Sequence, residues 1–406
     1  MARKLQTDEW LFGAAAGLAL FGVVMVYSAA GPLAFRQGGS QYQHVLKQGG
    51  WTLAGLVGMV LMMNFDYGRL RHRFVVRGGL ILTVLLLMAV FAFPRINGAH
   101  RWIRLGFVSF QPSELAKLVL TLFLARFLER RAGEEHDLWK TFAPCLLVTG
   151  GLVGLVALEP DLGTAMMLGM ICLVLLYTAG ANLRHLGVMG AAALAGVVAM
   201  IALFPWRMKR IVAFLDPWAD AQGTGYQVVQ SLLAVSSGGT NGLGFAEGRQ
   251  KMLFLPFAHS DYIFAVVGEE LGLIGALTVI GVFGLLLWRG VRAAFRAPDR
   301  FGMLLGMGIV TGIVVQALFN ISVVLSLVPP KGIPLPFISY GGSSMLLTLS
   351  SIGVLLNISQ QGSPQGSNSG GARTFVRRQA APVVVPAPRR REPVAQPEWR
   401  PESWRG

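Results

Sequence analysis

Residues 142–180 read FAPCLLVTGGLVGLVALEPDLGTAMMLGMICLVLLYTAG, two apolar runs on either side of the polar turn Glu159-Pro160-Asp161. Neither run contains a charged residue, and each approaches the roughly 20 residues that a helix needs to cross a bilayer. The hydrocarbon core offers the backbone no hydrogen-bonding partners, which favours helices because they satisfy their own backbone. The stretch therefore predicts two antiparallel membrane helices joined by a short turn.

The same pattern continues along the chain of 406 residues. Hydrophobic residues make up 53% and charged residues 14%, against about 25% charged residues in ordinary globular domains. The mean hydropathy is +0.57. These values exclude a purely soluble enzyme and a disordered or fibrous protein. The apolar blocks predict ten transmembrane helices, near residues 10–30, 48–64, 75–93, 111–127, 142–158, 162–180, 185–204, 262–288, 302–323 and 342–358.

The sequence accordingly predicts an all-α polytopic membrane protein with three parts. They are a short cytoplasmic N-terminus (1–9), a ten-helix transmembrane domain (10–360) and a disordered, basic, Pro- and Arg-rich cytoplasmic tail (361–406). A long extracytoplasmic loop, residues 205–261, separates the seventh and eighth helices. In this orientation the cytoplasmic segments carry 23 Lys and Arg residues and the outer loops 11, in agreement with the positive-inside rule.

The charge and the cysteine content exclude further classes of protein. The net charge of +15 falls mostly in short loops and the tail, without the interleaved aromatic residues of a nucleic-acid surface. We therefore expect no nucleic-acid partner. Cys145 and Cys172 both lie inside apolar blocks, which argues against a disulfide framework and against a cysteine zinc site.

Two charged residues lie within the fourth predicted helix. Glu114 and Lys117 follow Pro112, which suits the start of a helix. Their i, i+3 spacing places both side chains on one helix face, where they can pair. Two interpretations stay open: an ion pair that orients the helix, and a polar cavity wall that also contacts substrate.

Further acidic residues lie where the chain enters the membrane from outside. Asp161 either caps the sixth helix or binds a cation or an arginine, and Asp261 either caps the eighth helix or takes part in chemistry. The adjacent His-Ser-Asp triplet is not a hydrolase triad, because neighbours in sequence do not converge on one point. Glu269 and Glu270 are expected about 12–14 Å deeper, at about 1.5 Å per helical residue.

A proline-rich segment, residues 329–344, reads PPKGIPLPFISYGGSS. Its four prolines forbid a regular helix, and Gly341 and Gly342 permit a close approach of the backbone. We predict a rigid re-entrant wall that contains Ser339 and Ser343.

Acids and bases from distant segments collect at the predicted outer boundary of the membrane: Arg101, Glu114, Asp161, Lys251, Asp261 and Lys331. Such a face suits a substrate with an anionic head group and a lipid tail, because basic groups hold pyrophosphate. A carboxylate such as Asp261 can accept a proton from an attacking hydroxyl. The sequence has no Walker A or Rossmann motif, so an activated substrate or an ion gradient must supply the energy.

Several of these segments resemble one known family. They are Asn97-Gly98-Ala99-His100-Arg101-Trp102, the QPSELAK run at 111–117, PDLGT at 160–164, GYQ at 225–227, the stretch from His259-Ser260-Asp261 to Glu270-Leu271-Gly272, and PLPFISYGGSS at 334–344. Together they resemble the SEDS family (shape, elongation, division and sporulation) over about residues 10–360. The last motif is highly specific, and the tail lies outside the resemblance.

The resemblance implies a ten-span fold and an inverting peptidoglycan glycosyltransferase. Such enzymes polymerise lipid II into glycan strands on the outer face of the bacterial cytoplasmic (inner) membrane. The proposed catalytic base of the family corresponds to Asp261. The side chains that we expect to bind substrate or to support the site are Arg101, Glu114, Lys117, Asp161, Lys251, Lys331, Ser339 and Ser343.

The resemblance also implies cofactors and partners. Activity in the family depends on a divalent cation, Mg or Mn, with no nucleotide or organic cofactor. The implied protein partners are a class B penicillin-binding protein, which is a transpeptidase, and other divisome membrane proteins. The implied substrates are lipid II and glycan linked to undecaprenyl pyrophosphate.

Details of the motifs favour the division-type branch of the family, which acts at the septum, over the elongation-type branch. The matching residues are Tyr27-Ser28-Ala29, Gly268-Glu269-Glu270 and Pro330-Lys331-Gly332. Phe257 departs from the family pattern, which has Glu at this position. The role of that carboxylate must be absent or supplied elsewhere, for which Glu247 is a candidate.

Four other functions stay open: a lipid II flippase, an elongation-type polymerase, an ion-coupled transporter and a structural scaffold of a division complex. A flippase needs a polar cavity open alternately to both sides, whereas the charges here collect on one face. A transporter tends to carry midplane charges and inverted repeats, and neither is clear in this sequence. The basic tail fits a docking role, which can coexist with enzyme activity.

Overall fold

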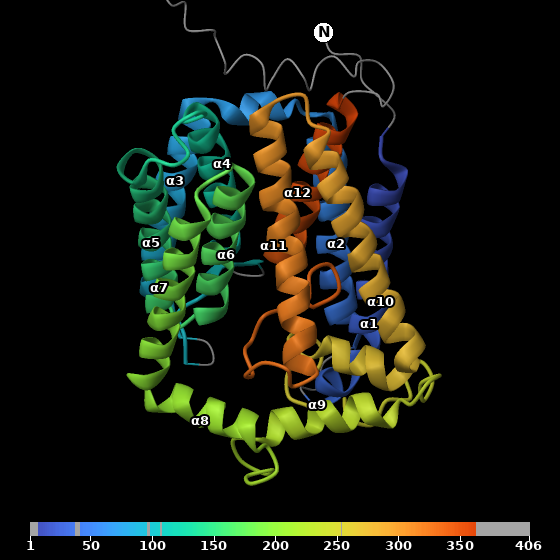
Figure 1. The fold of residues 1–406 in the computed structure, drawn as a ribbon. Coiled ribbons are helices and arrows are strands. Elements are labelled where there is room, and N and C mark those ends of the chain that lie inside the picture. The colour runs from blue at the N-terminus through green and yellow to red at the C-terminus, as the bar shows by residue number, and fades with distance from the viewer. Residues whose placement is uncertain (1–6, 37–40, 96–97, 106–107, 253, 363–406) are drawn as a thin grey trace, which may run out of the picture. The chain divides into compact units, whose positions relative to one another are not determined.

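The computed structural model describes residues 7–36, 41–95, 98–105, 108–252 and 254–362. The predicted tail therefore lies almost wholly outside the described residues, as does most of the predicted N-terminal segment. The described part is a bundle of long helices (Figure 1).

Each of the ten predicted apolar blocks falls on one long helix. These helices are α1 (Glu9–Arg36), α2 (Gln41–Asn64), α3 (Arg73–Ala89), α4 (Pro112–Arg130), α5 (Ala143–Leu158), α6 (Leu162–Thr178), α7 (Leu183–Ala202), α10 (Ile263–Phe295), α11 (Arg300–Val324) and α12 (Gly342–Gln361). The most buried spans are α11 and α12, which form the centre of the bundle. Helix α2 packs along α12, and α11 packs against α4, α6 and α10.

Within the described residues, eight helices are long and apolar enough to cross a membrane. The chain is thus a multi-pass membrane protein. Helices α4 and α6 are not among the eight. Helix α4 carries five charged residues, and α6 has 17 residues.

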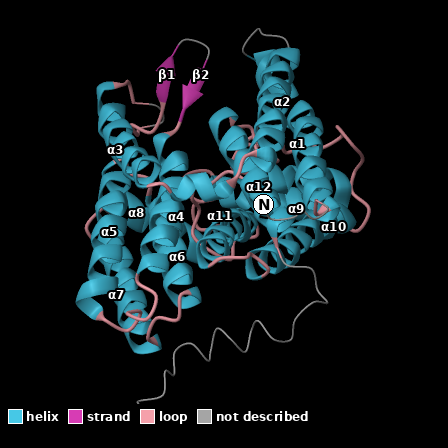
Figure 2. Ribbon diagram, turned by 90° about the horizontal axis from the view of Figure 1, so that it is seen from above, coloured by secondary structure: helices cyan, strands magenta, loops and turns pink. Residues whose placement is uncertain are grey.

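Short elements connect the long helices. The all-α prediction misses a two-stranded antiparallel hairpin, in which β1 (Ile103–Leu105) pairs with β2 (Val108–Phe110). The strands have three residues each, with apolar side chains alternating with Arg104 and Ser109, a pattern too short to predict a strand. Figure 2 shows the hairpin at the edge of the bundle, between α3 and α2. The other connecting elements are η1 (Tyr67–Arg71), η2 (Val90–Ala92) and the π-helical turn η3 (Leu138–Phe142).

The long loop between α7 and α10 contains two helices, α8 (Pro205–Leu215) and α9 (Tyr226–Ser237). Figure 1 shows both lying across one end of the bundle, transverse to the long helices. Helix α9 packs against α10. The loop is therefore a structured cover over the end of the bundle where Asp161 and Asp261 lie.

Helix α10 is broken at Gly272, whose φ of 66° and ψ of −164° are non-helical. The first segment, 263–271, therefore does not continue the direction of the rest of the helix. Glu269 and Glu270 belong to this first segment, before the break, so the expectation that they lie about 12–14 Å deeper, at about 1.5 Å per helical residue, stays a prediction that depends on the direction of the segment. Both side chains are buried.

The glycine-rich stretch at 238–244 supplies the hydrogen bonds that the break removes. The carbonyl oxygens of Glu269 and Glu270 accept from the amides of Leu243 (3.0 Å) and Gly244 (3.1 Å), and the amide of Leu273 donates to Gly239 (2.9 Å). A Cβ at position 272 would lie 2.3 Å from the Gly242 nitrogen. The backbone groups at the break and in the loop thus form hydrogen bonds with each other, which buried backbone groups require.

We expect Gly272→Ala to destabilise the protein by about 1–3 kcal/mol, because the backbone conformation excludes side chains and the new methyl group would meet the loop. Thermal unfolding of the purified protein in detergent measures the effect. Gly281→Ala is the matched control, since this glycine lies in the same helix with no atom within 4 Å of its Cβ position. Equal stability of the two variants would contradict the proposed packing of the break.

Candidate active site

Asp261 lies in the loop immediately before α10. The cap position of α10 is Tyr262, and Asp261 does not cap the helix, so the capping interpretation is wrong. Among the described residues, none donates a hydrogen bond to its half-buried carboxylate. A carboxylate without donors retains its full capacity to accept a proton or a substrate hydroxyl.

The backbone around Asp261 is held from two sides. Asn320 in α11 donates from Nδ2 to the carbonyl oxygens of Asp261 (2.7 Å) and Ile333 (2.7 Å). The Ser339 hydroxyl donates to the carbonyl oxygen of Ser260 (2.6 Å). The loop before α10 and the proline-rich segment are therefore fixed against each other.

Gly332 shows how closely these two segments approach. A Cβ at this position would lie 2.7 Å from Oδ2 of Asp261. Any side chain there would displace the carboxylate, so the close approach requires glycine.

Charged residues from three other segments lie within electrostatic range of the Asp261 carboxylate. Burial raises its pKa to about 6; Arg101 and Arg210 oppose the rise, and Asp161 adds to it. The carboxylate is therefore ionised at neutral pH and takes up a proton in mildly acidic solution.

Arg101 is held by the turn between α5 and α6. It donates from Nε to the carbonyl oxygen of Glu159 (3.3 Å) and from Nη2 to that of Pro160 (2.5 Å). Asp161 caps α6, as one interpretation predicted, and accepts from the amide (3.1 Å) and the hydroxyl (2.9 Å) of Thr164. The same turn thus orients one cation and one carboxylate.

Glu159 is fully buried, and neither carboxylate oxygen has a hydrogen-bonding partner among the described residues. Burial and the neighbouring Asp161 raise its pKa to about 8, against the opposing effect of Arg101. It therefore carries a proton at neutral pH and adds no charge to the site.

Lys331 brings a further cation to this end of the bundle. Its ammonium group lies 2.7 Å from the Met166 sulfur. Burial lowers its pKa to about 8; Asp161 opposes the shift, and Arg207 and Arg210 reinforce it. Arg101, Arg210 and Lys331 therefore share the neighbourhood of Asp161 and Asp261.

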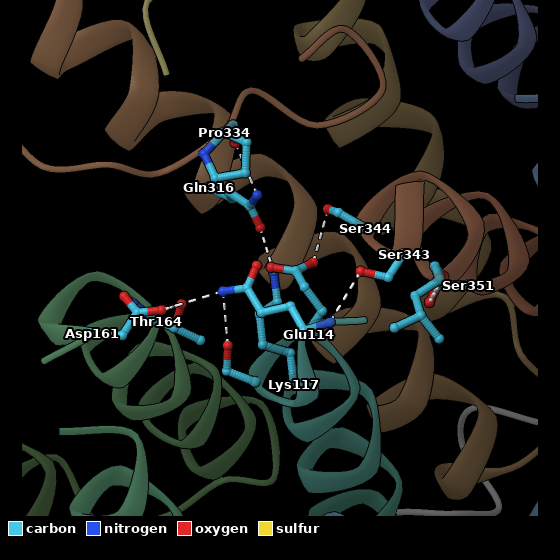
Figure 3. A network of polar contacts seen from close by, with 12 residues as sticks. Glu114, Lys117, Asp161, Thr164, Gln316, Pro334, Ser343, Ser344 and Ser351 are labelled. Atoms are coloured by element: carbon cyan, nitrogen blue, oxygen red, sulfur yellow. Dashed lines mark hydrogen bonds and ion pairs between the residues drawn. The ribbon is translucent and has the colours of Figure 1, made fainter. Parts of the chain in front are cut away.

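A second group of polar residues lies deeper between the helices (Figure 3). Lys117 Nζ lies 2.9 Å from Glu114 Oε1 and donates to Gln316 Oε1 at 2.5 Å. Gln316 donates from Nε2 to the carbonyl oxygen of Pro334 (2.9 Å), and the Ser344 hydroxyl donates to Glu114 Oε2 (2.9 Å). The predicted i, i+3 ion pair is confirmed, and it joins α4, α11 and α12.

The same ion pair lines a cavity of about 40 Å³ between α4, α6, α11 and α12. This exceeds the roughly 10–15 Å³ that one water molecule needs. The polar part of its lining consists of Glu114, Lys117, Thr121, Gln316, Thr348 and Ser351. Both earlier interpretations of Glu114 and Lys117 thus describe part of the geometry: they brace the helices, and they form a polar cavity wall.

Gln111 links the deeper group to the outer charges. It donates from Nε2 to Ser113 (3.0 Å) and to Asp161 Oδ2 (3.4 Å). The backbone amide of Gln111 donates to the Ser343 hydroxyl (3.3 Å). The predicted wall residues Ser339 and Ser343 therefore act through backbone contacts, one on each side of the site.

Lys251 belongs to a separate buried group. Its ammonium group contacts Ser28 Oγ (2.7 Å) and Glu270 Oε1 (2.5 Å). Glu269 accepts from the amides of Arg249 (2.7 Å) and Gln250 (3.0 Å). Lys251 thus attaches the long loop to α1 and α10, and its described polar contacts do not include Asp261.

Sequence reasoning missed Asn320, Gln316, Gln111 and Arg210. Asn320 and Gln316 are polar residues within an apolar block, spaced i, i+4, and that spacing was an available signal. For Arg210 the sequence offered no signal beyond the high basic content of the outer loops.

A resident metal ion has few protein ligands at this site. In the described part of the chain, no group of three or more His, Cys, Asp or Glu side chains is placed to hold one. Asp161 accepts hydrogen bonds from Thr164 and Gln111, and Glu159 carries a proton at neutral pH, which leaves Asp261 as the charged carboxylate with open oxygens.

Comparisons with known proteins agree on one family. The FtsW, RodA and SpoVE family, described as "Cell cycle protein", matches residues 9–363. A probable peptidoglycan glycosyltransferase FtsW of Geobacter metallireducens is 40% identical over 349 residues, covering 85% of this chain and 92% of that protein. Stage V sporulation protein E of Bacillus subtilis is 39% identical over 345 residues, covering 84% and 94% respectively.

Solved structures share the fold. One is described as "Structural coordination of polymerization and crosslinking by a peptidoglycan synthase complex"; a chain of it matches with a TM-score of 0.73 at 31% identity, covering 87% of this chain and 98% of that chain. The crystal structure of Thermus thermophilus rod shape determining protein RodA matches with a TM-score of 0.65 at 28% identity, covering 89% and 99%.

Removing the cation of the buried ion pair tests its bracing role. Lys117→Met leaves the buried Glu114 without its partner, which should cost about 3–5 kcal/mol of stability. The double variant Glu114→Gln, Lys117→Met should recover most of the loss. Thermal unfolding in detergent measures both. Lys140→Met is the control, because Lys140 is exposed and pairs at the surface; a Lys117→Met protein as stable as this control would contradict the bracing role.

Proposed function

The chain belongs to the FtsW, RodA and SpoVE family of cell cycle proteins, and from this premise we propose that it polymerises lipid II with Asp261 as general base. Its relatives at about 40% identity are named peptidoglycan glycosyltransferase FtsW, which supports a division-type peptidoglycan polymerase. The observation that carries the proposal is a carboxylate without hydrogen-bond donors in the described residues, within electrostatic range of Arg101 and Arg210, while Lys331 lies near Asp161 and Arg210.

The reaction needs a base and an anion-binding surface. A sugar hydroxyl of one lipid-linked unit attacks the anomeric carbon of the growing strand, and the bond from that carbon to the diphosphate breaks. The hydroxyl proton passes to Asp261, and the electron pair leaves with the lipid diphosphate. Attack opposite the leaving group inverts the anomeric centre. General-base help of this kind contributes roughly 10²–10⁴ in rate.

The cations hold the diphosphate. Arg101 and Arg210 present planar guanidinium groups that suit phosphate oxygens, and Lys331 adds a point charge. Arg210 donates to the Pro330 carbonyl oxygen (3.3 Å) and so stays beside Lys331. Charge that develops on the leaving oxygens meets fixed positive groups.

A divalent cation, Mg or Mn, would fit this site if the Asp261 carboxylate and the substrate diphosphate bound it together. Such ions are often held by one or two carboxylates together with substrate phosphates. Asp261 is the protein oxygen donor open to it, and the ion would supply further charge neutralisation at the diphosphate.

We further propose that all ten long helices cross the membrane, with both termini in the cytoplasm. Helices α4 and α6 pack between spanning helices, and α4 buries Glu114 against Ser344. The site then lies on the outer face, beneath the extracytoplasmic helices α8 and α9. This location suits action at the division septum.

The proposed protein partner is a class B penicillin-binding protein, the transpeptidase that would crosslink the new strands. It is supported by the likeness to a chain of a structure described as a peptidoglycan synthase complex that coordinates polymerization and crosslinking. We also propose that other divisome membrane proteins bind this chain.

Asp261→Asn should nearly abolish glycan polymerisation, because the amide accepts no proton. The assay combines the purified chain, a class B penicillin-binding protein, lipid II and a divalent cation, and resolves the products by length. The matched control is Asp216→Asn, an exposed acid of the same outer loop that should polymerise normally. A wild-type ladder from folded Asp261→Asn protein would refute the base. Movement of labelled lipid II across liposomes without polymer would favour a flippase.

The pH dependence follows from two pKa values. The rate should rise through about pH 6 as Asp261 ionises and fall above about pH 8 as Lys331 loses its charge. Arg101 lowers the pKa of Asp261, so Arg101→Gln should move the acid limb to higher pH. Initial rates with fluorescent lipid II between pH 5 and 9 measure the limbs. Lys140→Gln is the control, and an acid limb that Arg101→Gln leaves in place would contradict the assignment.

A further inference from the structure

Four arginines gather where α3 begins and α4 ends. Arg73 and Arg77 are spaced i, i+4 on α3, and Arg126 and Arg130 have the same spacing on α4. The two helices pack together, as Figure 1 and Figure 2 show. Arg126 lies within electrostatic range of the other three. We call these four residues the arginine cluster.

Acidic groups of the described part of the chain offset the arginine cluster only in part: Glu129 lies within electrostatic range of Arg126 and Arg130 but forms its ion pair with Arg71. The members of the cluster form no ion pair with any described carboxylate. The acids nearby, Glu129 and Asp299, pair with Arg71 at 2.9 Å and 4.0 Å. Like charges at i, i+4 repel each other, so an anion bound here would relieve an unfavourable arrangement on both helices.

An exposed apolar strip runs from the cluster along α3. Ile81, Leu85 and Met88 follow Arg77 at helical spacing and are 62%, 58% and 57% exposed. Phe74, beside Arg73, is 67% exposed, and the Arg73 guanidinium lies 5.0 Å from its ring centroid. A row of cations above a lipid-facing apolar strip matches an amphiphile with an anionic head and hydrocarbon tails.

We propose that the arginine cluster binds the head group of an anionic phospholipid, with an acyl chain along Ile81, Leu85 and Met88. Basic pockets between membrane helices bind such head groups in other proteins. A soluble anion would use the arginines and leave the strip unused. Under the proposed orientation the lipid belongs to the cytoplasmic leaflet, at the opposite end of the bundle from Asp261. The proposal does not rest on the glycosyltransferase activity.

Lipid titration of the full-length protein in detergent tests the proposal. Phosphatidylglycerol should bind in preference to phosphatidylcholine. Replacing the cluster (R73Q/R77Q/R126Q/R130Q) should weaken phosphatidylglycerol binding by at least about tenfold. The smaller variant R73Q/R77Q removes two exposed side chains and should lose part of the affinity without loss of folding. Unfolding temperature reports on folding in each case.

Two controls distinguish a site from general attraction. The variant R377Q/R378Q/R390Q/R391Q removes four arginines from the tail and should leave the affinity unchanged. The soluble head group, glycerophosphoglycerol, should compete at least tenfold more weakly than the lipid. Equal loss of affinity in the tail variant, equal binding of both lipids, or equal competition by the soluble head group would each overturn the proposal.

Discussion

Two hydrogen bonds from Asn320 join the segments on which the active site depends. Its amide donates to the carbonyl oxygens of Asp261 and Ile333 from the buried helix α11. In a membrane bundle the backbone of an irregular loop must find partners within the protein, because lipid offers none. Asn320 provides them at the point where the loop before α10 meets the proline-rich segment. The backbone of Asp261 is thereby fixed, while its carboxylate accepts no hydrogen bond from a described residue.

The site consists of an outer layer of charges and an inner layer of satisfied polar groups. At the outer end, Arg101 and Arg210 lie within electrostatic range of Asp261, and Lys331 lies within electrostatic range of Asp161. Below them Lys117 pairs with Glu114 and donates to Gln316. The outer groups retain open bonding capacity, whereas most bonds of the inner groups are made within the protein. We therefore assign the chemistry to the outer layer and the stabilisation of the fold to the inner layer.

Much of this arrangement could be predicted from the sequence. Long apolar blocks fix helix positions because lipid leaves the backbone little choice, and the Glu114–Lys117 pair follows from helical spacing. The break at Gly272 could not be predicted, because a glycine in an apolar run also fits an unbroken helix. Its cause is the loop at 238–244, which is distant in sequence and inserts its own backbone groups. Arg210 was missed for the same reason, since its partner Pro330 lies 120 residues away.

In the proposed reaction, Asp261 receives the proton of the attacking sugar hydroxyl while nearby cations hold the diphosphate. A cryo-EM structure of the chain with an unreactive lipid-linked disaccharide tests this geometry directly. We expect the diphosphate against Arg101, Arg210 and Lys331, and the acceptor hydroxyl within about 2.6–3.2 Å of the Asp261 carboxylate or one water away. A bound substrate whose sugars lie away from Asp261, with its diphosphate at other residues, would contradict it.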